Sequence, residues 1–459
     1  MTAQTILPAN SVTGGFEVSN SLRFDKPSDS YLAKTFSSAG STRKFTFSTW
    51  LKGHDTAVHG STYFFVGNIN GSSNIDAIGI TNTGIQISIN SANSGSLNST
   101  ALFRDLNAWY HFVIGVDTEQ GTASNRVKVY INGVQITDWD TETYPSQNYD
   151  FTGINSTEVH NVSYSDSEHN GYLCETVFID GTQLDQTSFG EFDSDSGIWK
   201  PIDVSGLTFG QNGFYLEYKQ TGTSANSSGL GADTSGNDHH FSVNGLAAHD
   251  QSTDTCTNNF CTLNPLTARG SSGNTLAEGN LQYSAVAGAG DSSVFGTLAI
   301  PPGMKVYFEV KLVQNTAQNS IGIHDLYDGG DGAYVRGGSE AGTYSFKPRG
   351  AASVTQYFNN GSSTNHSVNN AANDTILGVA IDNENGQIHY SLDGTFINSS
   401  DPTDNNPVAL VTGFGGATEQ YIHASLDTSG GTEPINQFNF GSPPYVESGG
   451  NSDANGHGN

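Results

Sequence analysis

Apolar and polar residues alternate in short runs along most of this chain. In Lys44-Phe45-Thr46-Phe47-Ser48-Thr49-Trp50-Leu51, an extended backbone would place mostly aromatic side chains on one face and mostly polar ones on the other. Such alternation predicts a half-buried strand. Similar runs predict further strands in the first half of the chain, at residues 63–66, 85–89, 109–116 and 127–131.

Glycine, asparagine and aspartate separate these runs. Asn132-Gly133 lies between two strand-like runs, and this pair favours a type I′ turn because both central residues of that turn need a positive φ. Asp393-Gly394 gives a similar signal in the second half of the chain. There, alternation returns from residue 281 and predicts strands at residues 305–312, 375–382, 386–391 and 437–440.

No stretch carries a sustained helical repeat, so we expect an all-β protein built from sandwiches or jelly rolls. Residues 1–203 and 280–446 are each expected to form one sandwich. Residues 204–279 show less periodicity and are expected to form an irregular connecting segment with short strands, one of them at 213–218. The polar residues 447–459 are expected to form a flexible tail.

Charge and hydropathy narrow the range of partners. The chain has 17 Lys and Arg against 45 Asp and Glu, a formal net charge of −28, and such a surface repels phosphate backbones and anionic lipids. We therefore expect no nucleic-acid partner. No apolar stretch approaches the ~20 residues of a membrane span, and the first ten residues lack the basic and apolar regions of a signal peptide, so we expect no membrane insertion and synthesis in the cytoplasm.

The motifs of the first domain follow an order known from one lectin-like superfamily. SLRFD at residues 21–25 precedes the aromatic run around Trp50, then WYHF at 109–112, the run through Asn132-Gly133, and ETVFIDG at 175–181. Residues 21–203 therefore resemble the laminin-G-like branch of the concanavalin A-like lectin/glucanase superfamily.

The second domain resembles SPRY domains, which are concanavalin-like sandwiches used for binding. The matching phrases are VYFEV at 306–310, SIGI at 320–323, DTILGVAID at 374–382, IHYSLDG at 388–394 and FNFGSPPY at 438–445. The two resemblances together imply two concanavalin A-like jelly-roll sandwiches joined by the irregular segment.

The pairing of these domains, with the linking residues 235–243 and 257–266, is similar to large structural proteins of marine bacteriophages. This resemblance implies a non-enzymatic protein of the virion surface that serves as a tail fibre, head fibre or capsid decoration. Its partners would be other virion proteins and a host cell-surface glycan. A polysaccharide depolymerase and a purely architectural capsid or tail protein are the alternatives.

Five residues are candidate ligand-binding positions. Trp139 lies among polar residues just after a hairpin, where an aromatic face can stack on a sugar, although packing against the sandwich edge is the stronger interpretation. In SPRY-like modules variable loops form the ligand surface, which suggests Tyr334, Arg336, Tyr344 and Tyr357. An ordinary surface ion pair is the stronger interpretation of Arg336.

Catalytic and metal sites are weakly indicated. A retaining glycosidase needs two carboxyl groups about 5–5.5 Å apart, but the acidic run from Glu191 to Asp195 lacks the family's third acid and follows the last core strand, so we expect a solvated loop.

Calcium is the one cofactor considered. The loops at residues 70–76 and 117–125 could supply its oxygen ligands, and no individual residue is assigned to it. Zinc is not expected, because the following residues cluster without a common zinc spacing: His239, His240, His249, Cys256 and Cys261.

Three further expectations concern burial and assembly. Trp50, Trp109 and Phe112 are expected in the core, and Cys174 is expected to be a buried thiol on a strand. Because lectin-like sandwiches bind single sugars weakly, we expect a symmetric homo-oligomer, with a trimer favoured.

Overall fold

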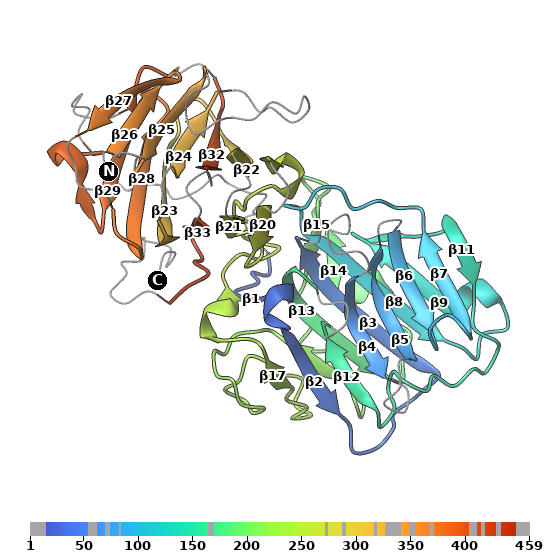
Figure 1. Ribbon diagram of the computed structural model, residues 1–459. Helices are drawn as coiled ribbons and strands as arrows, with labels where there is room; N and C mark the ends of the chain where they lie inside the picture. Colours follow the sequence, from blue (N-terminus) through green and yellow to red (C-terminus); the bar gives the residue numbers. More distant parts are fainter. Residues whose placement is uncertain are drawn as a thin grey trace. The chain divides into compact units, whose positions relative to one another are not determined.

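The computed structural model describes the chain from residue 15 to residue 446 with gaps. The described ranges are 15–53, 62–68, 74–81, 84–163, 169–270, 274–286, 291–315, 319–325, 341–348, 355–366, 371–403, 411–414, 418–427 and 433–446. Within them the secondary structure consists of β-strands and short 3-10 helices, which confirms the all-β fold class (Figure 1). The tail expected at residues 447–459 lies outside the described residues.

The described chain divides into two compact units, with the division between Asn259 and Phe260. The expected connecting segment therefore does not stand between two sandwiches. Residues 204–259 belong to the first unit because their short strands pair with both of its sheets.

Two sheets form the first unit (Figure 1). Sheet I has the order β10-β9-β8-β3-β13-β1-β18, with β16 beside β13. Its strands are β1 (Ser21–Phe24), β3 (Lys44–Lys52), β8 (Tyr110–Asp117), β9 (Val127–Ile131), β10 (Val134–Gln135), β13 (Gly171–Asp180), β16 (Phe214–Leu216) and β18 (Gln251–Ser252). Sheet II has the order β11-β7-β6-β5-β4-β12-β2-β17. Its strands are β2 (Tyr31–Thr35), β4 (Thr62–Asn68), β5 (Ile75–Thr81), β6 (Gly84–Ile89), β7 (Gly95–Ser99), β11 (Trp139–Thr143), β12 (Val159–Val162) and β17 (Ser242–Asn244).

The core of the first unit is formed by apolar side chains from the inner faces of most strands in the two sheets. Phe45, Phe47 and Leu51 of β3 all face this core, as period-two alternation requires. Phe112 also belongs to it, which confirms its expected burial.

The opposite face of sheet I is also covered. Trp50 is buried there beside Trp199, and Trp109 is only half-buried against the same cluster. The expected burial of Trp50 is therefore confirmed, in a second core cluster that later parts of the chain complete, whereas Trp109 is only half-buried and its expected core position is wrong. Trp199 comes from a small ribbon of β14 (Gly190–Phe192) and β15 (Trp199–Pro201).

Two buried ion pairs attach residues 250–259 to sheet I. Nη2 of Arg23 lies 3.0 Å from Oδ1 of Asp250, and Nζ of Lys52 lies 2.6 Å from Oδ2 of Asp254. The side chains of both cations are 0% exposed. Since a buried charge needs its partner, these pairs hold residues 250–259 against β1 and β3, two strands near the start of the chain.

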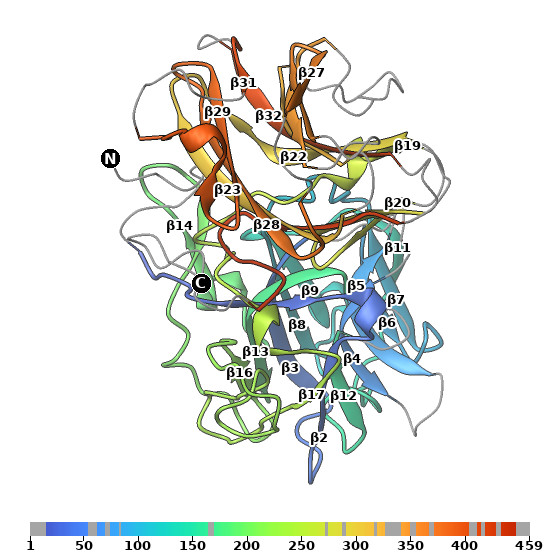
Figure 2. The ribbon, with the colours of Figure 1, turned by 60° about the vertical axis from the view of Figure 1, so that its left-hand side comes forward.

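Two further sheets form the second unit (Figure 2). Sheet III has the order β19-β22-β32-β24-β25-β26-β27. Its strands are β19 (Arg269–Gly270), β22 (Asp291–Ile300), β24 (Ser320–His324), β25 (Thr343–Lys347), β26 (Thr355–Asn359), β27 (Ser362–His366) and β32 (Gln420–Asp427). Sheet IV has the order β20-β21-β33-β23-β28-β29-β30, with β31 beside β29. Its strands are β20 (Asn274–Ala277), β21 (Gln282–Ala285), β23 (Lys305–Gln314), β28 (Thr375–Asp382), β29 (Gln387–Leu392), β30 (Thr395–Phe396), β31 (Val411–Thr412) and β33 (Ile435–Asn439).

The two expected hairpin turns are confirmed by their backbone angles. Asn132 and Gly133 have φ of +48° and +78°, and Asp393 and Gly394 have φ of +46° and +78°. Both pairs join neighbouring antiparallel strands, β9 to β10 and β29 to β30. The short helices are η1 (Lys26–Ser28), η2 (Ala123–Asn125), η3 (Gln186–Ser188), η4 (Ala248–Asp250), η5 (Pro265–Thr267) and η6 (Ile397–Ser399).

Candidate functional site

Of the four expected SPRY-type ligand residues, the structure describes Tyr344 and Tyr357, and it places both in strands. Tyr334 and Arg336 lie outside the described residues. Tyr344 is in β25, is 7% exposed and packs its ring 5.2 Å from that of Phe414. Its expected loop position is wrong, because strand alternation points this side chain into the core of the second unit. Tyr357 is half-buried in β26 and packs against the same core.

Trp139 lies at the start of β11, an edge strand of sheet II. Its side chain is half-buried and packs against the core of the first unit. A register shift between Trp139 and Thr141 interrupts the pairing of β11 with β7 at this point. The position combines edge packing with partial exposure, so Trp139 remains a candidate for stacking on a ligand.

The second unit carries a pocket of about 310 Å³ on the face of sheet IV that points away from its core. Three strand residues lie directly opposite one another across this face: Tyr307 of β23, Ala380 of β28 and His389 of β29. The chain from Gly394 through β30 to Thr403 borders the pocket and contributes Phe396 to its wall. The pocket is thus built by strand register, and its residues were not recognised in the sequence.

A glycine allows one aromatic ring to lie across this face. A side chain at Gly378 would meet the hydroxyl oxygen of Tyr307 at 2.7 Å and the Oγ of Ser391 at 2.3 Å. The hydroxyl of Tyr307 donates a hydrogen bond to Oε1 of Glu309 over 2.8 Å. The glycine thus leaves room for the tyrosine ring, and the hydrogen bond to Glu309 holds the ring beside the pocket.

Few polar groups line this mainly apolar pocket. Nζ of Lys305 lies 2.7 Å from Oδ2 of Asp382, whose side chain is 8% exposed. His389 is 1% exposed, and burial lowers its pKa, so the imidazole is neutral. Within the part of the chain that the structure describes, its Nδ1 has no hydrogen-bonding partner. An apolar pocket of this size with a few polar groups is the usual form of a small-molecule site.

The first unit contains a serine–histidine pair that resembles half of a hydrolytic triad. Nε2 of His111 lies 2.9 Å from Oγ of Ser48, and the indole N–H of Trp199 donates to Nδ1 of His111 over 2.9 Å. An indole N–H only donates, so Nδ1 must accept and the proton must reside on Nε2. His111 therefore donates to Ser48 and cannot remove its proton. Burial also lowers the pKa of His111 to about 3, which keeps the ring neutral.

Glu175 is a buried carboxyl group beside this pair. It lies at a bulge in β13, where the register with β3 shifts, and its φ is +49°. The hydroxyl of Tyr215 donates to its Oε2, and burial raises the pKa of Glu175 to about 7. The cavity bordered by Glu175, Ser48 and His111 measures about 10 Å³, which has room for one water molecule and none for a sugar ring.

The acidic run after the last core strand is engaged in local contacts. Nζ of Lys200 lies 3.3 Å from Oε1 of Glu191 and 3.2 Å from Oδ2 of Asp193. The backbone N–H and hydroxyl of Ser196, together with Lys200, hold the pKa of Asp193 well below its usual range. A general acid needs a raised pKa, so Asp193 is unsuited to that role.

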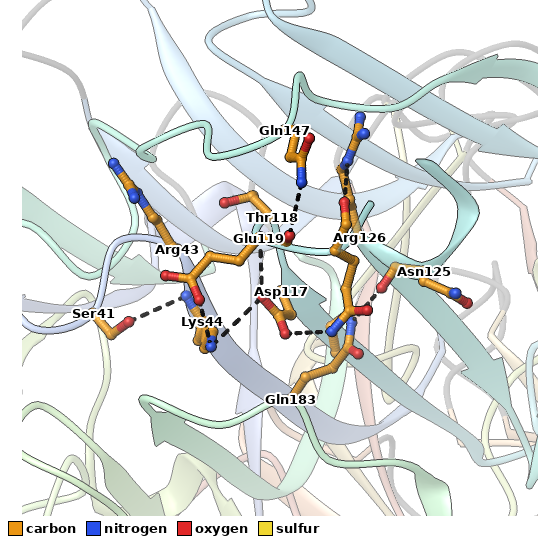
Figure 3. A network of polar contacts seen from close by, with 12 residues as sticks. Ser41, Arg43, Lys44, Asp117, Thr118, Glu119, Asn125, Arg126, Gln147 and Gln183 are labelled. Atoms are coloured by element: carbon orange, nitrogen blue, oxygen red, sulfur yellow. Dashed lines mark hydrogen bonds and ion pairs between the residues drawn. The ribbon is translucent and has the colours of Figure 1, made fainter. Parts of the chain in front are cut away.

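One loop considered for calcium already has cationic neighbours (Figure 3). Nζ of Lys44 lies 2.7 Å from Glu119 and 3.9 Å from Asp117. The guanidinium of Arg126 donates to the carbonyl oxygens of Gln120, Gly121 and Pro145. These contacts occupy carboxylate and carbonyl oxygens of the kind that would bind calcium.

The other metal-site candidates are described only in part. Of the loop at residues 70–76, the described Asp76 accepts hydrogen bonds from the backbone N–H groups of Asn90, Gly153 and Ile154. Among the residues that the structure describes, no three His, Cys, Asp or Glu side chains gather as they would around a metal. Those same residues include no helix with the length and apolar character needed to span a membrane.

Residues 26–184 match the family model described as the concanavalin A-like lectin/glucanases superfamily. The first unit contains a concanavalin A-like domain. The matched residues include β2 through β13, so the strands of residues 204–259 are added to this domain from beyond the match.

Several solved structures are similar to this chain at low identity. The SPRY domain of human HERC1 is 10% identical and covers 38% of this chain and 96% of its own, with a TM-score of 0.26. Domains LG4-5 of the mouse laminin alpha1 chain are 10% identical, and the match covers 99% of this chain and 90% of the laminin fragment, with a TM-score of 0.30. A pentraxin from Limulus polyphemus is 15% identical, and the match covers 37% of this chain and 80% of the pentraxin chain, with a TM-score of 0.29. No curated protein matches the chain.

Proposed function

We propose that this chain is a non-enzymatic, glycan-binding protein of a bacteriophage virion surface, in a tail fibre, a head fibre or a capsid decoration. The pocket on sheet IV is the observation that carries the binding proposal, because it joins an aromatic ring to a few polar groups on a rigid sheet. The match of residues 26–184 to a lectin/glucanase family supports carbohydrate as the ligand class. The resemblance to marine phage proteins supports the virion location.

The chemistry of the pocket suits a sugar. A sugar ring has apolar C–H faces, which pack on the rings of Tyr307 and Phe396, and hydroxyl groups, which pair with polar side chains at the border. Lys305 and Thr403 border the pocket and can donate to ligand oxygens. Buried polar groups of a ligand need such partners, so we expect a sugar with substantial apolar surface to bind best.

Three features support binding without catalysis. His111 donates to Ser48 and so cannot activate it, the pKa of Asp193 is lowered, and the cavity beside Glu175 is too small for a sugar. A depolymerase would need paired carboxyl groups facing a groove. The proposed protein therefore holds a polysaccharide and leaves its length unchanged.

Replacing Tyr307 with alanine is expected to weaken glycan binding about tenfold, because the variant loses a stacking surface worth about 1.4 kcal/mol. A glycan array identifies ligands, titration calorimetry measures the dissociation constants, and chromatography of the incubated polysaccharide detects released oligosaccharides. Tyr421→Ala, on the other sheet of this unit, is the matched control and should bind normally.

Three outcomes would contradict this proposal in different ways. Binding that survives Tyr307→Ala and disappears in Trp139→Ala would place the site on the first unit. Oligosaccharide release that disappears in Glu191→Gln would show a depolymerase. Absence of binding to every glycan tested would favour the purely architectural alternative.

We further propose that the protein acts as a symmetric homotrimer, since several weak sites acting together give useful attachment. With a net charge of −28 per chain, copies repel one another, and salt screens that repulsion. Sedimentation at low and high salt should therefore show tighter association at high salt. A strict monomer under both conditions would contradict the trimer.

A further inference from the structure

Two of the three cysteines lie side by side in the first unit. The thiol of Cys174 donates to Sγ of Cys256 across 3.7 Å, although the two residues are 82 positions apart in the sequence. A disulfide has an S–S length of about 2.05 Å, so the sulfurs would need to approach by about 1.6 Å. Cys174 is 0% exposed, as the sequence predicted, and Cys256 is partly exposed.

The two cysteines differ in how freely they can move. Cys174 lies in β13, a strand that pairs with β1, β3 and β16. Cys256 lies in a tight turn closed by reciprocal backbone hydrogen bonds between Thr255 and Asn258. Rotation of the partly exposed Cys256 side chain can therefore bring the sulfurs together while the strand stays in place.

We propose that Cys174 and Cys256 form a latent disulfide that closes by exchange with a low-molecular-weight disulfide. Cys256 is the entry point because it is the more exposed. Its thiol loses a proton to solvent, and its sulfur attacks the small disulfide and releases one small thiolate. The sulfur of Cys174, deprotonated in turn, attacks the mixed disulfide and releases the second thiolate. The protein thus loses two electrons and two protons, and the small disulfide is reduced to two thiols.

The surroundings make the closed form long-lived and its formation slow. Val18, Trp50 and Trp199 pack around the pair and restrict the access of reductants. Burial raises the pKa of both thiols, which lowers the fraction of reactive thiolate at neutral pH. Formation should therefore accelerate as the pH rises.

Closure would join two distant parts of the first unit by a covalent bond. The turn that carries Cys256 already contacts the start of the unit, since Oγ1 of Thr257 accepts from the backbone N–H of Val18 over 3.0 Å. A cross-link between residues so far apart restricts the unfolded chain. The oxidised first unit should therefore resist unfolding better than the reduced one. Cys261 lies in the core of the second unit and takes no part.

The test uses the full chain, purified reduced and incubated with oxidised glutathione at pH 8.5. We expect the thiols titratable in denaturant to fall from three to one, the intact mass to fall by two hydrogens, and the urea midpoint of tryptophan fluorescence to rise. All four tryptophans lie in the first unit, so this signal reports on it alone. Dithiothreitol should reverse each change.

Single variants decide which cysteines react. Cys261→Ser should fall from two thiols to none, whereas Cys174→Ser should form no internal bond and carry at most a glutathione adduct. An unchanged count of three thiols, stable glutathione adducts on the unmodified sequence, or bonds between chains would overturn the proposal. None of these outcomes depends on glycan binding.

Discussion

Replacing Asp254 with alanine is expected to lower the free energy of unfolding of the first unit by about 3–5 kcal/mol, because it removes the carboxylate that neutralises the buried ammonium of Lys52. Lys52 and Asp254 side chains are 0% and 3% exposed, and their charged atoms are 2.6 Å apart. Oδ1 of Asp254 also accepts from the indole N–H of Trp109 over 3.1 Å. Urea unfolding followed by tryptophan fluorescence measures the loss in the first unit.

Two variants separate the buried charge from other causes. Arg43→Ala breaks an exposed ion pair with Asp150, at 38% and 56% side-chain exposure, and should change the stability far less. The double variant Lys52→Met with Asp254→Leu should recover much of the loss, since no unpaired charge stays buried. A single Asp254→Ala variant as stable as the unmodified protein would contradict the role assigned to this pair.

Local pattern was enough to predict individual strands and turns. The expected strand from Lys44 to Leu51 is β3, one residue longer, and the positive φ of Asn132 and Gly133 follows from the needs of their turn. Both features depend on neighbours in the sequence, which is why alternation and turn chemistry identify them.

Features that depend on distant residues were missed. Nothing near Asp250 or Asp254 in the sequence shows that Arg23 and Lys52 neutralise them, so these residues were included in the connecting segment predicted at 204–279. Period-two alternation also cannot show that both faces of β3 are covered, so it does not reveal the second buried cluster around Trp50.

The candidate pocket could not be predicted for a related reason. Tyr307, Ala380 and His389 become neighbours only through the register of three strands, and two of those strands are about 70 residues apart in sequence. Tyr344 was assigned to a loop because the sequence around it does not mark where its strand, β25, begins. The site therefore depends on strand pairing, which single-sequence periodicity does not specify.

The unmodified protein is expected to become less stable as the pH rises, because Glu175 loses its proton. Replacing Glu175 with glutamine is expected to abolish this pH-dependent loss of stability. The pKa of Glu175 is about 7 in the folded protein, against an ordinary value of 4.5 for a glutamate side chain. The folded state therefore holds this proton more tightly, so the stabilisation is complete below about pH 4.5 and is lost as the pH rises through 7. The shift corresponds to about 3 kcal/mol between those limits.

Urea unfolding from pH 4.5 to 8.5, followed by tryptophan fluorescence, tests this expectation. Glu175→Gln should match the unmodified protein near pH 4.5 and exceed its stability at pH 8.5, because the amide stays neutral where the buried carboxylate is charged. Glu17→Gln alters an exposed side chain of the same unit and should reproduce the unmodified pH dependence. Parallel pH curves for Glu175→Gln and the unmodified protein would show that Glu175 is ionised in the folded state across this range.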